Sequence, residues 1–129
     1  THGTTFGGNP LAMAVGQAVM DIVLAPGFLD HVRKMGLYFK QRLAGVADAH
    51  PEVVAEVRGE GLLLGIRCLQ PVPDVVAALR DQGLLSAGAG ENVVRLLPPL
   101  IVTEKEIDAG IAMLDQALTT LEPAKAGAA

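Results

Sequence analysis

The sequence predicts an α+β fold, with two N-terminal helices, a small and mainly antiparallel sheet, and a C-terminal helix. Apolar residues recur every three or four positions over residues 28–47 and again over 107–121, which is the helical period. Between these stretches lie short apolar runs separated by glycine-rich turns, which are typical of short antiparallel strands. The helical repeats and the short apolar runs together predict helices that pack with one small sheet.

The first predicted helix follows a glycine-rich loop at the start of the chain. Asn9 is a suitable N-cap, and Pro10 fits the first turn, where its missing N–H costs no hydrogen bond. The helix is expected to end near Leu24, before a Pro-Gly pair. Gln17 and Asp21 are four positions apart, so they form one narrow polar line on an otherwise apolar helix. This pattern predicts a helix that is buried in a larger protein.

The second helix is expected over residues 28–47, because its apolar residues fall on one side and its basic residues on the other. Pro51 ends this helical stretch. Two strands are then predicted at 53–57 and 62–69, with a turn at 58–61 that contains two glycines.

A short helix and two further strands are predicted next. The helix is expected to open at Pro73 and to stop at Gly83, with Val76 and Leu79 as its apolar contacts. The first of these strands is expected at 84–87 and the second at 93–97, joined by a loop at 88–92.

The last helix carries the clearest local signal. Thr103 and Glu106 have the Thr-x-x-Glu spacing of a capping box. The apolar residues after it form one continuous stripe at helical spacing. The stripe consists of Ile107, Ile111, Leu114, Leu118 and Leu121.

Composition excludes several classes of function. The chain is 50% hydrophobic and 19% charged, which is typical of soluble globular proteins. A formal charge of -4 disfavours nucleic acid and anionic membranes as partners. The single cysteine, Cys68, cannot form an intramolecular disulfide and fits a reducing compartment. The most apolar run, residues 10–25, is interrupted by polar residues and falls short of the roughly 20 residues of a membrane span.

Two places carry residues that are suited to binding an anion. The N-terminal loop combines glycines with Thr4 and Thr5, directly before a helix N-terminus, and so offers O–H and N–H donors with little steric bulk. The alternative is a polar loop that only caps the helix. Alternation places Arg95 on one strand face with Val93 and Leu97, where a guanidinium needs a carboxylate or phosphate partner. The alternative is an edge-strand arginine that reaches solvent along its stem.

The remaining polar residues favour structural interpretations. Arg58 is expected to be solvated or locally paired, and Arg67 to face solvent or to bridge to another element. Cys68 shares a strand face with apolar residues, so a buried thiol is expected. His31 and His50 lack the spacing of metal ligands, and no metal site is predicted.

Four segments of the chain resemble a known enzyme family. The loop HGTTFGGNPLA at 2–12 is followed, in order, by VRGEGLLLGI at 57–66, GLLSAGAGENVVRLLPPL at 83–100, and the closing helix after VTEKEID. These segments resemble the C-terminal part of class III (ornithine-type, fold type I) aminotransferases, over nearly the whole chain. HGTTFGGNPLA together with VVRLLPPL looks most like the acetylornithine-type branch of that family. The resemblance implies pyridoxal 5'-phosphate as cofactor and the small C-terminal domain of a fold type I enzyme.

The resemblance also implies roles for three residues. Thr5 falls on the family threonine that binds the cofactor phosphate in the active site of the neighbouring subunit. Thr4 falls where acetylornithine-type enzymes contact substrate, also across the dimer. Arg95 falls on the family arginine that lies near the substrate carboxylate and can pair with a glutamate of the large domain.

No lysine of this chain is suited to bind the cofactor. Pyridoxal-phosphate chemistry needs a lysine amine in a desolvated pocket. Lys34 and Lys40 are expected on the polar side of the second helix, Lys105 in the first turn of the last helix, and Lys125 in the tail. The resemblance implies that the catalytic lysine lies in a large domain outside this chain, so the chain alone is predicted to be inactive.

The resemblance divides the chain into three parts. Residues 1–26 are expected to be a loop and connecting helix from the large domain, 27–123 the small domain, and 124–129 a frayed tail. The whole enzyme is expected to be a cytoplasmic homodimer that transfers an amino group from N-acetylornithine to 2-oxoglutarate in arginine biosynthesis. Two alternatives remain: a class III enzyme acting on succinyldiaminopimelate, ornithine, succinylornithine or 4-aminobutyrate, or a non-catalytic module for oligomerisation or anion binding.

Overall fold

The computed structural model describes residues 3–121, so His2, Lys125 and the predicted tail at 124–129 lie outside the described residues. The elements in chain order are α1 (Pro10–Val23), α2 (Phe28–Ala49), β1 (Val54–Glu60), β2 (Leu63–Cys68), α3 (Val72–Asp81), β3 (Ala87–Ala89), β4 (Val93–Leu96) and α4 (Glu104–Leu121). These helices and the four-stranded antiparallel sheet confirm the predicted α+β class. The chain forms two compact units, Thr1–His31 and Val32–Ala129.

The first unit consists of the N-terminal loop, α1 and the start of α2. The side chain of Asn9 caps α1 as predicted, because its Oδ1 accepts hydrogen bonds from the N–H groups of Leu11 (3.0 Å) and Ala12 (3.4 Å). Gln17 donates to Asp21 at 2.8 Å and forms the predicted polar line. No residue of α1 is buried. Its exposed apolar side chains are Leu11, Met13, Val15, Val19, Met20 and Ile22.

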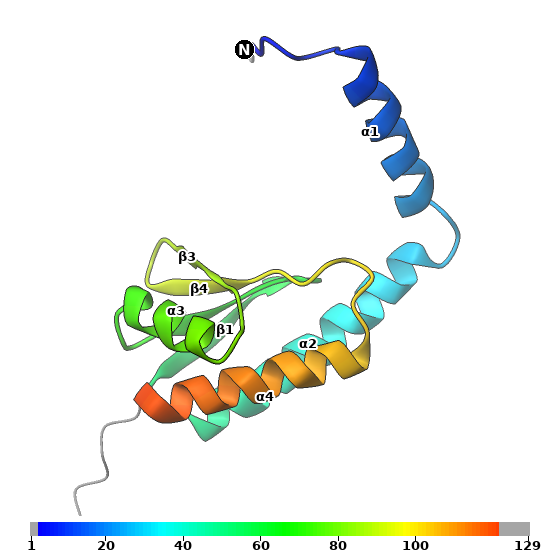
Figure 1. Cartoon of the computed structure of the whole chain (residues 1–129). Helices are drawn as coiled ribbons and strands as arrows, with labels where there is room; N and C mark the ends of the chain where they lie inside the picture. The colour runs from blue at the N-terminus through cyan, green and yellow to red at the C-terminus, as the bar shows by residue number, and fades with distance from the viewer. Residues whose placement is uncertain (1–2, 122–129) are drawn as a thin grey trace, which may run out of the picture. The chain divides into compact units, whose positions relative to one another are not determined.

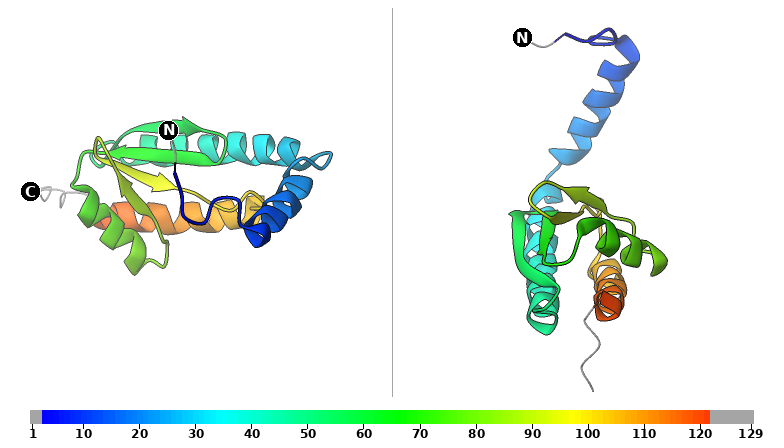
Figure 2. Two further views of the ribbon diagram at one scale, coloured as in Figure 1. Left: turned by 90° about the horizontal axis from the view of Figure 1, so that it is seen from above. Right: turned by 90° about the vertical axis from the view of Figure 1, so that its left-hand side faces the viewer.

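In the second unit, one face of the sheet is covered by helices. The strand order is β1-β2-β4-β3, and all neighbours are antiparallel. Figures 1 and 2 show α4 and the part of α2 from Val32 onward side by side on one face of this sheet. The largest fully buried side chains come from α2, the strands, α3 and α4, and they form one core. They are Leu43, Val53, Leu64, Ile66, Val75, Leu79, Val94, Leu114 and Leu118.

Polar bridges fix α2 beside α4. Tyr38 donates to Asp108 at 2.8 Å, and Arg42 pairs with the same carboxylate at 2.9 Å. His50, which is buried at the end of α2, contacts Asp115 of α4 at 2.8 Å. No single helix among residues 3–121 has both the length and the apolar character to cross a membrane, and only α1 and α2 taken together meet that test.

The turn between β1 and β2 lies later in the chain than predicted. β1 continues through Glu60, which pairs with Leu63, so the turn consists of Gly61 and Leu62. The predicted turn at 58–61 is therefore wrong. Gly61 alone supplies the positive φ, 55°, that the first position of such a two-residue turn requires.

Strand β3 also begins later than predicted, at Ala87 instead of Leu84. The N–H of Leu84 donates to the carbonyl of Leu79 at 2.9 Å, so the hydrogen bonds that cap the end of α3 hold Leu84 outside the strand. Gly83 has a φ of 86° and ends α3 as predicted. The loop before β4 is consequently shortened to residues 90–92.

Two helices show how far local patterns hold. In α3, Val75 and Leu79 are fully buried, whereas the predicted contact Val76 is only partly buried. In α4 the capping box is present, because the N–H of Thr103 donates to Glu106 at 2.8 Å and the N–H of Glu106 to Thr103 at 3.3 Å. These bonds, chiefly the one from the Thr103 backbone, lower the pKa of Glu106. The predicted apolar stripe of α4 faces the core, with Ile107, Ile111, Leu114 and Leu118 buried and Leu121 partly buried.

Asn92 anchors the loop between β3 and β4, and its replacement should destabilise the fold. It has a φ of 59°, donates to the carbonyls of Cys68 (2.6 Å) and Gln70 (2.8 Å), and accepts from the N–H of Val72 (3.3 Å). Asn92→Ala loses these bonds and puts alanine in left-handed backbone, which asparagine tolerates better, so we expect the free energy of unfolding, measured by thermal unfolding, to fall by about 2 kcal/mol. Asn92→Gly tolerates this φ and should lose about 1 kcal/mol. Wild-type stability of Asn92→Ala would contradict this role.

Candidate functional site

Thr4 and Thr5 lie in the exposed loop before α1. Residues 5–8 form a turn, and the N–H of Asn9 donates to the carbonyl of Phe6 at 3.2 Å. Gly7 packs against the methyl group of Thr4, where a side chain would collide. The hydroxyl groups of Thr4 and Thr5 take part in no hydrogen bond with any of residues 3–121. This compact turn therefore presents two adjacent hydroxyl donors.

The N-terminus of α1 is less open to an anion than the sequence predicted. Pro10 has no N–H, and the N–H groups of Leu11 and Ala12 are bound by the side chain of Asn9. The helix dipole still favours an anion at this end, but these two N–H groups are not available to bind it. An anion at this loop would be bound mainly by the threonine hydroxyls and by the backbone N–H groups of the turn.

Arg95 faces away from the core, which corrects one expectation. Val94 and Leu96 of β4 are buried, and alternation along the strand places Arg95 on the opposite face, where it is exposed. Leu97, the predicted apolar neighbour, is itself 57% exposed. The predicted alternative was an edge-strand arginine that reaches solvent: Arg95 is exposed, but β4 is not an edge strand, because it lies between β2 and β3. Arg95 belongs to the second unit, whereas Thr4 and Thr5 belong to the first.

The outer face of the sheet carries three arginines, of which two are paired. Arg58 pairs with Glu56, which agrees with the predicted local pairing, and also with the distant Glu91. Arg67 of β2 lies 3.6 Å from Glu56 of β1, which agrees with the predicted bridge to another element. The hydrogen bonds that Arg58 donates, first to Glu56 and then to Glu91, raise the pKa of Arg58, and the bond to Glu56 lowers the pKa of that carboxyl group. Among residues 3–121, no carboxylate pairs with Arg95. On this face, the free cation is therefore Arg95.

A shallow groove of about 280 Å³ runs along this outer face. It is lined by both Arg58 and Arg95, with Gly65 of β2 between them in the strand register. The absence of a side chain at Gly65 leaves room above the sheet. Sequence reasoning missed this arrangement because it placed Arg58 in a turn. A two-residue turn that begins at Gly61 would have left Arg58 inside the first strand of the sheet.

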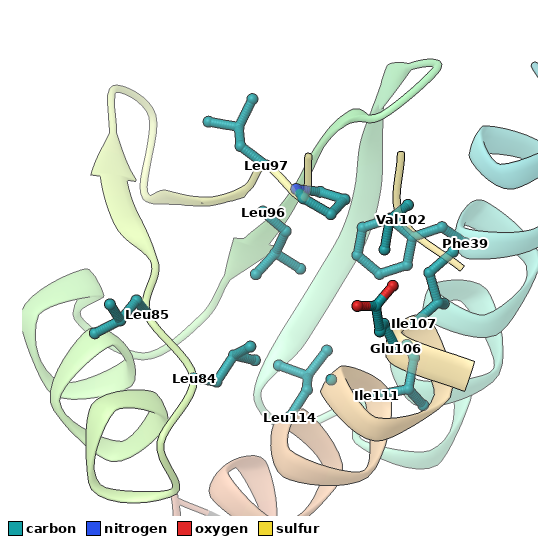
Figure 3. A pocket seen from close by; sticks show the side chains of 12 residues that line it. Phe39, Leu84, Leu85, Leu96, Leu97, Val102, Glu106, Ile107, Ile111 and Leu114 are labelled. Atoms are coloured by element: carbon teal, nitrogen blue, oxygen red, sulfur yellow. The ribbon is translucent and has the colours of Figure 1, made fainter. Parts of the chain in front are cut away.

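A second hollow, of about 140 Å³, is apolar and lies where the end of β4 meets α2 and α4 (Figure 3). Leu96, Ile111 and Leu114 line it. Its one charged lining residue, Glu106, already binds Thr103. The hollow therefore lacks a free polar group that could orient an amino acid.

The other reactive side chains have structural surroundings. Burial raises the pKa of Cys68 to about 11, so the thiol stays neutral near pH 7, as predicted for a buried cysteine. Lys34 pairs with Glu104 at 2.8 Å, Lys40 donates to the carbonyl of Gly59 at 3.1 Å, and Lys105 is exposed. The described part of the chain holds no cluster of three His, Cys, Asp or Glu side chains that could bind a metal.

Comparisons with known proteins agree on one family. The sequence profile described as "Aminotransferase class-III" matches residues 1–118. Acetylornithine aminotransferase 1 of Bradyrhizobium diazoefficiens is 59% identical over 121 residues, which cover 94% of this chain and 30% of that protein. Acetylornithine aminotransferase of Mesorhizobium japonicum is 60% identical over 106 residues, which cover 82% of this chain and 27% of that protein.

Solved structures support the same conclusion. Acetylornithine aminotransferase of Elizabethkingia anophelis superposes with a TM-score of 0.81 at 30% identity, covering 93% of this chain and 32% of that chain. Ornithine delta-aminotransferase of Plasmodium falciparum does so with a TM-score of 0.82 at 31% identity, covering 93% and 31%. The chain thus spans about 30% of the length of the curated relatives it matches. On the profile match, the sequence identities and the shared fold, this chain belongs to the class-III aminotransferase family.

Proposed function

We propose that this chain works as the C-terminal part of a pyridoxal-phosphate transaminase that moves an amino group from N-acetylornithine to 2-oxoglutarate. The observation that carries this proposal is the 59% identity to an acetylornithine aminotransferase over 94% of the chain. In this proposal, residues 1–26 extend from a large domain and residues 27–123 form the small domain. The complete enzyme is a cytoplasmic homodimer.

The residues of this chain fit one portion of the cofactor, its phosphate group. The hydroxyls of Thr4 and Thr5 are exposed and unbonded within residues 3–121, in a loop where Gly7 packs against the methyl group of Thr4. Bound pyridoxal phosphate would act as an electron sink for the carbon that carries the transferred amino group. The lysines among residues 3–121, Lys34, Lys40 and Lys105, are all exposed on helices, which supports a cofactor lysine in another segment of the whole enzyme.

Three side chains then have separate tasks. Thr5 donates its hydroxyl hydrogen to the cofactor phosphate in the active site of the neighbouring subunit, and Thr4 lines the substrate entrance there. Arg95 pairs with a substrate carboxylate, for which a planar guanidinium offers two parallel N–H donors. Its exposure and the lack of an ion pair within the described residues support this role.

A panel of amino donors tests the proposed substrate. With 2-oxoglutarate as acceptor, the full-length protein should use N-acetylornithine with a kcat/KM about tenfold or more above that for ornithine, succinylornithine or 4-aminobutyrate. Succinyldiaminopimelate belongs in the same panel, since it is the closest alternative among the proposed donors. A higher kcat/KM for any other donor would overturn the assignment of N-acetylornithine.

A further inference from the structure

The hairpin that carries Arg95 has little apolar anchorage at its outer edge. Strand β3 is only three residues long, consists of alanine and glycine, and has no buried residue. It pairs with β4 alone, because it is the edge strand. Burial of apolar surface therefore stabilises this edge only weakly. Strand β4 itself is anchored by the buried side chains of Val94 and Leu96 and by its pairing with β2, so polar contacts from the loop, residues 90–92, act on the outer part of the hairpin, β3 and the loop.

One of these contacts crosses the sheet. Arg58 in β1 pairs with Glu91 in the β3–β4 loop, although β2 lies between them. Arg58 and Arg95 are both register partners of Gly65, on either side of β2. Because Gly65 has no side chain, the guanidinium of Arg58 can pass over the middle strand. A Cβ on Gly65 would lie 2.7 Å from a methyl group of Val93, so the site favours glycine on packing grounds as well.

Arg58 itself is poorly suited to bind an anionic substrate. Its Nε donates to Glu56 and its Nη1 to Glu91, so two carboxylates compensate its charge. Arg95 lies in the same groove without such a partner among residues 3–121. The two arginines of the groove thus differ in role: one is engaged within the fold and the other is available.

We infer that Arg58 is a positioning residue, which holds the β3–β4 loop through Glu91 and so sets the direction in which Arg95 meets a carboxylate. The inference rests on the proposed function, in which Arg95 pairs with a substrate carboxylate. A guanidinium binds a carboxylate well only when its two donors are aligned with both oxygens, so a small shift of the hairpin weakens the pair.

Steady-state kinetics of the full-length holoenzyme test this inference. Arg58→Gln and Glu91→Gln should each raise the KM for the carboxylate substrate roughly three- to fivefold and change kcat by less than about twofold, because an exposed ion pair is lost and binding is affected more than chemistry. Arg58→Lys keeps a cation that can pair with Glu91, so its KM should stay within about twofold of wild type. Arg67→Gln is the matched control, because Arg67 lies on the same face and contacts Glu56 but not the loop.

Arg95→Gln separates this inference from the proposed function. It should raise the same KM by more than either bridge variant, because it removes the ligand itself. An unchanged KM in Arg95→Gln would overturn the role of Arg95 and the inference with it. A raised KM in Arg95→Gln with wild-type KM in Arg58→Gln and Glu91→Gln would overturn the inference alone, as would a KM in Arg58→Lys as high as in Arg58→Gln.

Discussion

Replacing Gly59 with alanine should lower the free energy of unfolding by roughly 3 to 5 kcal/mol. Gly59 lies inside β1, opposite Leu64, and has a φ of 111°, which residues with a Cβ rarely adopt. A Cβ at this position would also collide with the carbonyl of Leu63 and lie 2.9 Å from the Cα of Leu64. These are backbone atoms of the paired strand, so the hairpin cannot relax by turning a side chain. Denaturant-induced unfolding of the full-length protein measures the loss.

Gly45 provides a matched control with the opposite expected sign. It lies inside α2, and a Cβ there would meet nothing within 4 Å. Gly45→Ala should stabilise the protein by about 0.5 to 1 kcal/mol, because alanine favours the helix over the unfolded chain. If Gly59→Ala and Gly45→Ala were equally stable, the backbone conformation and close contacts at position 59 would not require glycine.

The second large effect concerns the cofactor. Thr5→Val removes a hydroxyl while keeping a β-branched side chain, so the full-length protein should bind pyridoxal phosphate roughly 10- to 100-fold more weakly. The physical reason is the loss of one hydrogen bond to a charged phosphate, which contributes about 1.5 to 3 kcal/mol. Equilibrium dialysis of the protein against graded cofactor concentrations measures the dissociation constant.

Two further variants make this test specific. Thr5→Ser keeps the hydroxyl and should retain cofactor affinity within about threefold. Thr4→Val alters the neighbouring hydroxyl, which the proposal assigns to the substrate entrance, so it should change the KM for the amino donor more than the cofactor affinity. If Thr5→Val binds the cofactor as tightly as wild type, the phosphate role of Thr5 is wrong.

The local elements could be predicted because their signals lie within a few residues. The cap at Asn9, the capping box of α4 and the apolar stripe of α4 all follow from contacts within one or two helical turns. The α+β class follows from these helices and from the short runs between them. The threonines of the N-terminal loop were singled out both by residue type and by resemblance to a family, and their roles stay predictions.

The strands were predicted less well, because their ends are set by pairing rather than by composition. A glycine-rich stretch such as residues 58–61 offers several places for a turn, and only the register of β1 on β2 selects Gly61 and Leu62. The same holds for β3, where Leu84 looks like a strand residue but is bound to the end of α3.

The sequence by itself determined the helices, their caps, the fold class and the residues worth testing, because each of these depends on neighbours along the chain. Tertiary structure alone decided which face of β4 is buried and therefore that Arg95 is exposed, because α2 and α4 cover only the opposite face of the sheet. It also decided that Arg58 meets Glu91, 33 positions away. Strand register brings such residues together, and no local pattern encodes it.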